Sequence, residues 1–430
     1  MKGVLSIFWK FTAFSLIMQW TNVGLADVSA TTPSLEDANV SPAAPHDFPW
    51  KLPKAIANWR LPDSVQIHGF ASQSYIFTSG NEFFGHSTNT GSLDFTEMGI
   101  NGSWRPLSQL QTSLQIVYRR AGRTDNSDLR IDFGFLDYSF ISDVDTLIGV
   151  RMGRVVTPLG IYNDTRDMPF TRPSIFLPQS IYFDVNRNFA LSGDGVQFYG
   201  EYRSKIGDFF LHANGFYPRT NDPDLKDTIS GSLPGYMREE PSWVTRLIYE
   251  WGAGKIRLGV TGGQFNAKYV PEGGENNYEP GAFRFSPILF SAQYNAENWS
   301  LTSEYAIRSS SLNHFGPRLP DTTIHGESYY VQGSYRFIES LEWFLRYDAL
   351  YWDKSDRSGK ELADATGLSA HRQFAKDITT GIRWDISPSF MARLEYHYIN
   401  GTGWISHLEN IDSEASQHWS MFAMSVSFRF

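Results

Sequence analysis

The chain has 430 residues, no cysteine and a net charge of −9, and 15% of its residues are aromatic. The acidic balance argues against a nucleic-acid partner. Without cysteine there is neither a disulfide framework nor a site for lipoprotein acylation. Beyond the N-terminus, no stretch approaches the roughly 20 consecutive apolar residues of a membrane-spanning helix, which excludes a helical membrane protein. A β-barrel is compatible with the same composition, because its strands are apolar only at alternate positions.

Residues 1–26 are expected to form a signal peptide. Lys2 supplies an early positive charge, residues 4–20 are mostly apolar, and Gly24–Ala26 offers a small-x-small cleavage site. A retained N-terminal anchor helix is the alternative. Residues 27–62 are rich in proline and serine, which predicts an irregular extension. We expect this extension to lie in the periplasm.

From residue 63 to residue 430, apolar and polar residues alternate in successive segments, the pattern of strands with one apolar face. The count is about sixteen segments, joined alternately by short turns and long polar loops. An even number of strands closes a barrel without an open edge and places both termini on the periplasmic side. The short turns are expected at Arg105-Pro106, Ser142–Asp145, Ser204–Gly207, Gly252–Gly254, Ala296-Glu297, Ile338–Ser340 and Ser387-Pro388. The long loops are expected at about 79–91, 121–128, 157–192, 218–241, 268–284, 309–325, 353–375 and 401–417.

The alternation also predicts which face of each strand meets lipid. Trp343, Leu345 and Tyr347 alternate with Arg346 and Asp348, so the aromatic set is expected outside and the charged set in the lumen. A soluble, secreted all-β protein would have the reverse arrangement and is the alternative. Large aromatic residues near the segment ends predict two interfacial girdles. These residues are Trp104, Tyr202, Trp243, Trp251, Trp299, Tyr351, Trp384 and Tyr398.

The last segment alternates to the end of the sequence. Phe422, Met424, Val426, Phe428 and Phe430 share one face. This pattern resembles the C-terminal signal that outer-membrane porins present to the barrel-assembly machinery, so that machinery is an expected partner through the terminal phenylalanine.

From residue 63 to residue 430, the chain resembles the sixteen-stranded Gram-negative outer-membrane porin superfamily in architecture. The resemblance implies an all-β fold, a transmembrane antiparallel β-barrel of about 16 strands with an inward-folded third loop. That loop corresponds here to about 157–192 and would form the pore constriction. It reads TPLGIYNDTRD over 157–167 and lacks the Pro-Glu-Phe-Gly-Gly motif of general porins, which indicates a distinct subfamily. The resemblance also implies a homotrimer in the cell outer membrane, in contact with lipid and lipopolysaccharide.

Porins of this kind select solutes by the charges that meet at the constriction. The loop is expected to contribute Asn163, Asp164, Arg166, Asp167 and Arg172. The wall is expected to contribute Arg119, Arg130, Arg151, Arg246, Arg257, Arg336, Arg346, Arg383 and Arg393. Acids on the same lumen face are Asp132, Glu201, Glu250, Glu304, Asp348, Asp385 and Glu395. A basic wall opposite an acidic loop would create a transverse field; alternatively, these charges pair with one another and keep the wall rigid.

The expected function is passive diffusion of small hydrophilic solutes or ions through a water-filled channel. A substrate-specific channel, for anions or carbohydrates, is the alternative within the class, although lysine is scarce in the wall. An outer-membrane hydrolase is the rival enzyme, but the chain has no Gly-x-Ser-x-Gly motif and nothing marks His397 or His418 as a catalytic base. We expect no catalytic residue, cofactor or metal. Asn221–Asp224 is expected to form an ordinary turn in preference to a divalent-cation site.

Overall fold

The computed structural model describes residues 62–430, except 126, 232–233, 273–278 and 317–319. The expected signal peptide, and the expected extension up to residue 61, lie outside the described residues. The chain divides into two compact units, one of residues 1–66 with 430 and one of residues 67–429. The second unit contains nearly all of the barrel.

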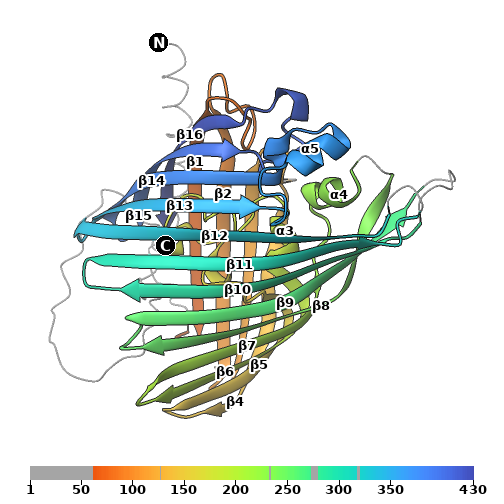
Figure 1. The fold of residues 1–430 in the computed structure, drawn as a ribbon. Helices are drawn as coiled ribbons and strands as arrows, with labels where there is room; N and C mark the ends of the chain where they lie inside the picture. The colour runs from red at the N-terminus through yellow and green to blue at the C-terminus, as the bar shows by residue number, and fades with distance from the viewer. Residues whose placement is uncertain (1–61, 126, 232–233, 273–278, 317–319) are drawn as a thin grey trace. The chain divides into compact units, whose positions relative to one another are not determined.

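Sixteen antiparallel strands form a closed barrel, in which each strand pairs with its neighbours in the sequence and β1 pairs with β16 (Figure 1). The predicted barrel of about 16 strands is therefore confirmed. The strands are β1 (Val65–Thr78), β2 (Ser92–Leu107), β3 (Leu110–Ala121), β4 (Leu129–Ser142), β5 (Thr146–Val156), β6 (Ser192–Ser204), β7 (Gly207–Pro218), β8 (Gly235–Trp251), β9 (Ile256–Pro271), β10 (Ala282–Asn295), β11 (Trp299–Asn313), β12 (Thr322–Ile338), β13 (Leu341–Tyr351), β14 (Phe374–Ser387), β15 (Phe390–Gly401) and β16 (His418–Arg429).

Short turns and long loops alternate as predicted, and in Figure 1 the turns lie at the left and the long loops at the right. Six turns lie within one residue of the predicted positions. The first turn was predicted wrongly, because it falls at Ser108-Gln109 and Arg105-Pro106 belongs to β2. The β2–β3 register shifts between Trp104 and Leu107, so the proline occupies a bulge, where its missing N–H is tolerated.

Several strands continue beyond the predicted segments. β8 begins at Gly235 and β12 at Thr322, because polar residues there still pair across strands although they carry no apolar face. The long loops contain short helices but, within the described part of the chain, no helix long and apolar enough to span a membrane. The helices are η1 (Asn163–Thr165), η2 (Pro169–Thr171), α3 (Arg187–Leu191), α4 (Pro223–Ser230), α5 (Lys360–Thr366), η3 (Ala370–Gln373) and η4 (Asp412–Glu414).

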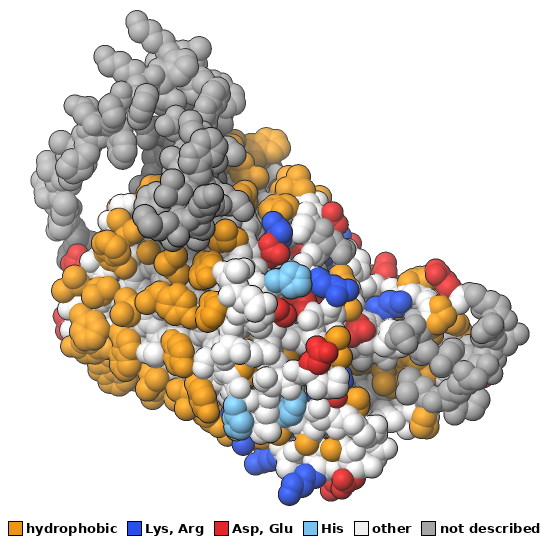
Figure 2. Space-filling model, turned by 90° about the horizontal axis from the view of Figure 1, so that it is seen from above, with side chains coloured by type: hydrophobic (Ala, Val, Ile, Leu, Met, Phe, Trp, Pro, Cys, Tyr) orange, Lys and Arg blue, Asp and Glu red, His pale blue; other side chains and the backbone are white. Residues whose placement is uncertain are grey.

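The strand faces follow the predicted alternation. Trp343, Leu345 and Tyr347 are exposed on the outer wall, whereas Arg346 and Asp348 are buried inside. In Figure 2, apolar side chains gather over the wall at the left, and polar and charged side chains gather at the right, where the long loops lie.

Seven of the eight predicted girdle aromatics are exposed on the outer wall, and Tyr351 is the exception. It is buried against Phe374, and the Arg357 guanidinium lies over its ring. The prediction for Tyr351 was wrong because a residue of the loop between β13 and β14 covers this strand end.

Candidate pore constriction

The loop between β5 and β6, residues 157–191, folds into the barrel. It carries η1, η2 and α3, and most of its side chains are buried, among them Phe176 and Tyr182. A loop without a sheet of its own must find hydrogen-bond partners for its polar groups. Inward-facing side chains of β2, β3, β8, β11, β13, β14 and β15 provide them. The inward-folded third loop expected from the sequence is confirmed.

Two buried arginines of the wall bind the loop through its carbonyl groups. Arg393 on β15 donates from Nη1 to the carbonyl oxygens of Pro169 (2.8 Å) and Ser174 (3.2 Å), and from Nη2 to a third carbonyl. Arg346 on β13 donates from Nη1 to Ser174 Oγ (2.9 Å) and to the carbonyl oxygen of Phe176 (3.2 Å). Because a guanidinium carries five N–H donors in one plane, each arginine holds several irregular backbone groups at once.

Glu304 on β11 binds the loop from another side of the barrel. Its carboxylate accepts hydrogen bonds from the Tyr182 hydroxyl (2.5 Å) and the Ile161 amide (3.1 Å), both in the loop. It also accepts from Tyr330 Oη (3.0 Å) and Ser291 Oγ (2.6 Å) on the wall. The four donors satisfy a fully buried charge, which is otherwise costly.

Two further carboxylates bind loop amides. Asp348 on β13 accepts from the Ser180 amide at 3.3 Å, and Glu395 on β15 accepts from the Ile175 amide. Donors and acceptors on several strands therefore bind the loop to the inner wall of the barrel.

A buried ion-pair cluster fills the space between the loop and strands β2 and β3. Asp184 Oδ1 lies 3.0 Å from Arg119 Nη2 and 3.3 Å from Arg166 Nη2. Arg172 Nη2 lies 2.5 Å from Glu97 Oε2. The cluster also includes Asp125, Asp167 and Arg187. Removing one partner of such a pair leaves an uncompensated buried charge, at a cost of about 3–5 kcal/mol.

Only one of the five predicted loop residues is exposed. The Asp164 side chain is 41% exposed, and its Oδ2 lies 2.5 Å from Nη2 of the buried wall residue Arg246. The other four are buried between the loop and its surroundings: Asn163, Arg166, Asp167 and Arg172. Asp164 is therefore the predicted loop residue that meets solvent in the lumen.

The nine predicted wall arginines fall into two groups. Four are buried and bind the loop: Arg119, Arg246, Arg346 and Arg393. Each of the other five pairs with a carboxylate: Arg130 with Asp125 (2.8 Å), Arg151 with Asp137 (2.9 Å), Arg257 with Glu250 (2.6 Å), Arg336 with Glu342 (2.8 Å) and Arg383 with Asp385 (2.9 Å). These five lumen arginines therefore stand in ion pairs, and Arg383 in addition donates from Nη1 to the carbonyl oxygen of Phe170 in the loop (3.2 Å).

Residues that hold the loop were missed by sequence reasoning. Glu97, Tyr182, Asp184 and Arg187 all contact it or belong to it, and none was among the predicted constriction residues. The charges of Asp184 and Arg187 within the loop were a usable signal, since a loop folded into a barrel needs internal counter-charges. Glu97 and Tyr182 carried no such local signal.

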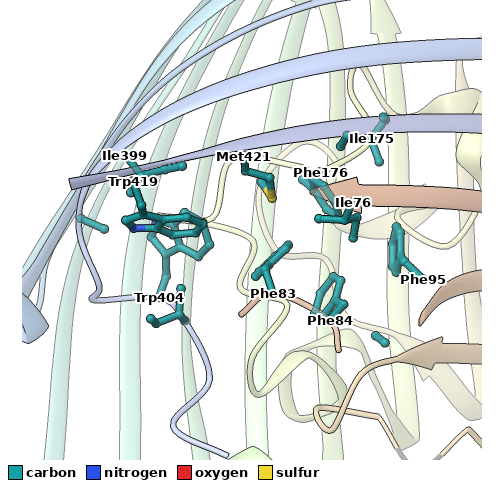
Figure 3. Packing of buried hydrophobic residues seen from close by; sticks show 14 of the residues in the cluster. Ile76, Phe83, Phe84, Phe95, Ile175, Phe176, Ile399, Trp404, Trp419 and Met421 are labelled. Atoms are coloured by element: carbon teal, nitrogen blue, oxygen red, sulfur yellow. The ribbon is translucent and has the colours of Figure 1, made fainter. Parts of the chain in front are cut away.

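Aromatic side chains pack against Phe176 of the constriction loop (Figure 3). Phe176 of the loop lies 5.2 Å from Phe83 and 5.9 Å from Phe84, between ring centroids. Phe83 also contacts Trp404 (5.4 Å), which contacts Trp419 (5.5 Å). Loops 79–91 and 402–417 thus meet the constriction loop in one apolar cluster.

Glu409 reinforces this contact between loops. Its carboxylate accepts hydrogen bonds from the backbone amides of Phe84 (2.9 Å), Gly85 (2.8 Å) and Arg123 (2.7 Å). One side chain of loop 402–417 therefore binds two other extracellular loops.

Helix α4 packs over the constriction from the loop after β7. Asp222 caps its N-terminus and accepts from the Asn188 amide (3.2 Å) of α3, while Asp224 accepts from Ser406 Oγ (2.5 Å). Ile229 is buried in the same apolar cluster as residues of β8 and β9. The stretch Asn221–Asp224 therefore begins a helix, and no group of three or more His, Cys, Asp or Glu side chains in the described ranges is placed to hold a metal ion.

Acidification is expected to tighten the contact of α4. Burial raises the pKa of Asp224 to about 7 and that of Asp222 to about 6. Because the packed state binds these protons more tightly, its stability is greatest below about pH 4 and is lost as the pH rises through 6–7. Hydrogen exchange of 223–230, corrected for intrinsic rates, should slow at least about tenfold from pH 8 to pH 5. Asp224→Asn should reduce this pH dependence; an unchanged dependence would contradict the assignment.

No family model matches the chain, and no curated protein matches its sequence. Solved structures are similar in fold. OmpT, an outer membrane protein of Vibrio cholerae, matches with a TM-score of 0.53 and 10% identity, over 85% of this chain and 97% of that chain. The anion-selective porin from Comamonas acidovorans matches with a TM-score of 0.53 and 13% identity, over 85% and 99%. OmpF of Salmonella typhi, in a complex with daunomycin, matches with a TM-score of 0.52 and 16% identity, over 85% and 97%.

At these identities the likeness is one of fold. The closed sixteen-strand barrel is the architecture that this chain shares with these outer-membrane proteins. The chain has the sixteen-stranded outer-membrane porin fold.

Proposed function

We propose that the protein is a porin, a water-filled channel for passive diffusion of small hydrophilic solutes or ions. The observation that carries the proposal is the loop 157–191, which enters a closed barrel and is bound to strands on several sides of it. A fixed loop of this kind narrows a pore, and the polar groups left in the lumen select by size and charge. A dedicated anion channel has less support, because the exposed arginines of the wall stand in ion pairs.

The test is single-channel recording of the detergent-folded protein in a planar lipid bilayer, with a salt gradient. We expect stepwise, ohmic conductance. A correctly folded protein that conducts no ions would contradict the proposal and favour a plugged, substrate-gated barrel.

Asp164→Asn is expected to shift the channel toward anions. The substitution removes the exposed carboxylate of the loop and leaves the Arg246 guanidinium uncompensated, so the lumen becomes more positive. A unit charge about 4 Å away is worth about 1 kcal/mol in water, which corresponds to about a fivefold change in the cation-to-anion permeability ratio. The reversal potential in a KCl gradient measures this ratio. Asp412→Asn, in an extracellular loop, is the control and should leave it unchanged; an unaltered ratio in the Asp164 variant rejects the role given to this residue.

A hydrolase is less well supported, and His397 shows why. Its Nδ1 lies 2.7 Å from Asp377 and 3.0 Å from Thr379 Oγ1, while its Nε2 lies 3.4 Å from Glu395. In a catalytic triad the nucleophile and the carboxylate bind opposite nitrogens of the imidazole. Here both share Nδ1, and the His397 residue is 1% exposed, so a substrate has no access. We assign His397 to the support of Glu395, which binds the loop.

We further propose that residues 1–26 direct export, that residues 27–62 lie in the periplasm, and that the protein forms homotrimers in contact with lipid and lipopolysaccharide. Apolar side chains exposed around the outer wall support contact with lipid or with a neighbouring subunit. Phe430 would present the C-terminal signal to the barrel-assembly machinery. Chemical cross-linking in outer-membrane preparations, which should give a trimeric band, tests the assembly.

A further inference from the structure

Three cations lie together on the outer wall, toward the extracellular ends of β8, β9 and β10. Arg238, Lys268 and Arg284 come from these strands in turn. Arg238 and Lys268 follow Met237 and Ala267, which are buried on the lumen side, so the two cations point outward. Arg284 is exposed and lies in the same outward phase as the exposed Ala282.

The sheet register brings these like charges close to one another. Arg238 and Lys268 are direct partners across β8 and β9. Arg284 is opposite Asn266, two residues before Lys268 on β9. Side chains directly opposite on one face have Cβ atoms about 4.5–5.5 Å apart, diagonal ones about 7–8 Å, and like charges so placed destabilise the pair. Neutralising this arrangement requires counter-ions between the strands, and Glu240, opposite Asn266 in the row of Arg284, is one of them.

Carboxylates of the described residues do not neutralise all three cations. Glu240 binds Arg238, with 2.6 Å between Oε1 and Nη2. Lys268 and Arg284 form no hydrogen bond or ion pair with any residue that the structure describes. Glu272 follows the end of β9 and contacts neither of them. Among the residues that the structure describes, three cations therefore face one carboxylate on this part of the wall.

The cations lie beyond the apolar band of the outer wall, on the side of the polar headgroups; Lys268 is opposite Ala282 and therefore lies two residues farther out than Arg284. Arg284 precedes Ile288, an exposed apolar residue of β10, by four residues, which is about 13 Å along a strand. With a strand tilt of about 40°, this is about 10 Å along the membrane normal. On β8, the exposed Trp243 lies between Arg238 and the apolar wall, as an interfacial aromatic does. The polar headgroup layer begins at this boundary.

We propose that Arg238, Lys268 and Arg284 form a binding site for a phosphate group of the phosphorylated glycolipid in the outer leaflet. A phosphate between the strands relieves the repulsion and forms charge-assisted hydrogen bonds with guanidinium and ammonium groups. The inference rests on the outer-membrane location of the protein and is independent of whether its channel conducts.

The test is a titration of the folded full-length protein in detergent with diphosphorylated lipid A, with bound lipid counted by native mass spectrometry. Each lost cation should weaken binding about fivefold, so Lys268→Gln with Arg284→Gln should weaken it about 25-fold. Arg154→Gln is the matched control. Arg154 lies on the outer wall of β5 but already pairs with Asp194 at 2.8 Å, so its loss should change binding less than about twofold.

Further arms of the experiment separate the alternatives. Lipid A stripped of phosphate should bind equally weakly to the wild type and to the double variant. Competition by millimolar inorganic phosphate would identify a free-phosphate site and overturn the lipid assignment, as would unaltered binding of diphosphorylated lipid A by the double variant. The charge-conserving pair Lys268→Arg with Arg284→Lys should retain binding, which keeps the test decisive if the glutamine variant folds poorly. Single-channel conductance of the double variant should equal that of the wild type. The lipid titration therefore tests the lipid site, and the conductance tests the channel independently of it.

Discussion

Arg393→Met is expected to release the constriction loop and to raise the single-channel conductance, with frequent transitions between conductance levels. Arg393 is buried and donates to three carbonyl groups of the loop. Methionine fills a similar space but offers no donor. Each buried carbonyl group left without a partner costs about 1–3 kcal/mol, so the bound position of the loop loses at least about 3 kcal/mol. This corresponds to more than a hundredfold in its population relative to displaced positions.

Arg336→Met is the matched control for this prediction. Arg336 also faces the lumen, but it is half-exposed, pairs with Glu342 and binds no residue of the loop. Its loss should leave the conductance levels and the current noise near those of the wild type. If the Arg393 variant also behaves like the wild type, the loop is held by its other contacts, and the role given to Arg393 is wrong.

Glu304→Ala is expected to lower the unfolding temperature of the folded protein and to expose the loop to trypsin. The substitution leaves three buried hydroxyl donors without their acceptor: Tyr182 of the loop, and Tyr330 and Ser291 of the wall. The Ile161 amide loses one of its two acceptors and keeps Tyr182 Oη. At about 1–3 kcal/mol for each unpaired donor, the cost is about 3 kcal/mol or more. In the wild type, Arg166 and Arg187 are buried and should resist cleavage; in the variant, cuts after these residues should appear in native digests.

Glu342→Ala controls for the loss of a lumen carboxylate, because Glu342 binds only the half-exposed Arg336 at the periplasmic end of the barrel. It should change neither the unfolding temperature nor the digest by a measurable amount. A Glu304 variant that is as stable and as resistant as the wild type would show that the loop does not depend on β11.

The barrel was predictable because strand alternation is a local property. Successive side chains of a strand point to opposite faces, so the even-numbered Arg346 and Asp348 lie on the face opposite to the odd-numbered Trp343 and Leu345, whatever the rest of the chain does. The inward course of the third loop came from the resemblance to porins, and the opposite charges within residues 157–191 are consistent with it but do not specify it. At the start of β8, residues pair across strands beyond the apolar band. Apolar and polar residues do not alternate there, so the sequence predicted a loop where the structure has a strand.

The candidate site was predictable only in part. Parity assigned all nine wall arginines to the lumen face, but it did not separate those that are buried against the loop from those that stand in more exposed ion pairs. That distinction depends on contacts between distant positions, such as Arg393 with Ser174, which are 219 residues apart. Within the loop, Asp164 is exposed and Asp167 is buried although they lie three residues apart, because an irregular backbone has no period from which to infer orientation.

The partners of loop 157–191 come from both ends of the barrel sequence. Glu97 lies on β2, which precedes the loop, whereas Arg393 lies on β15, the last strand but one. The binding surface for the loop is therefore incomplete until the barrel is nearly closed, and the polar groups of the loop must stay hydrated while ten further strands are added. Narrowing of the lumen is consequently a late event of biogenesis, and a barrel arrested before its final strands are in place has a wide and unobstructed interior.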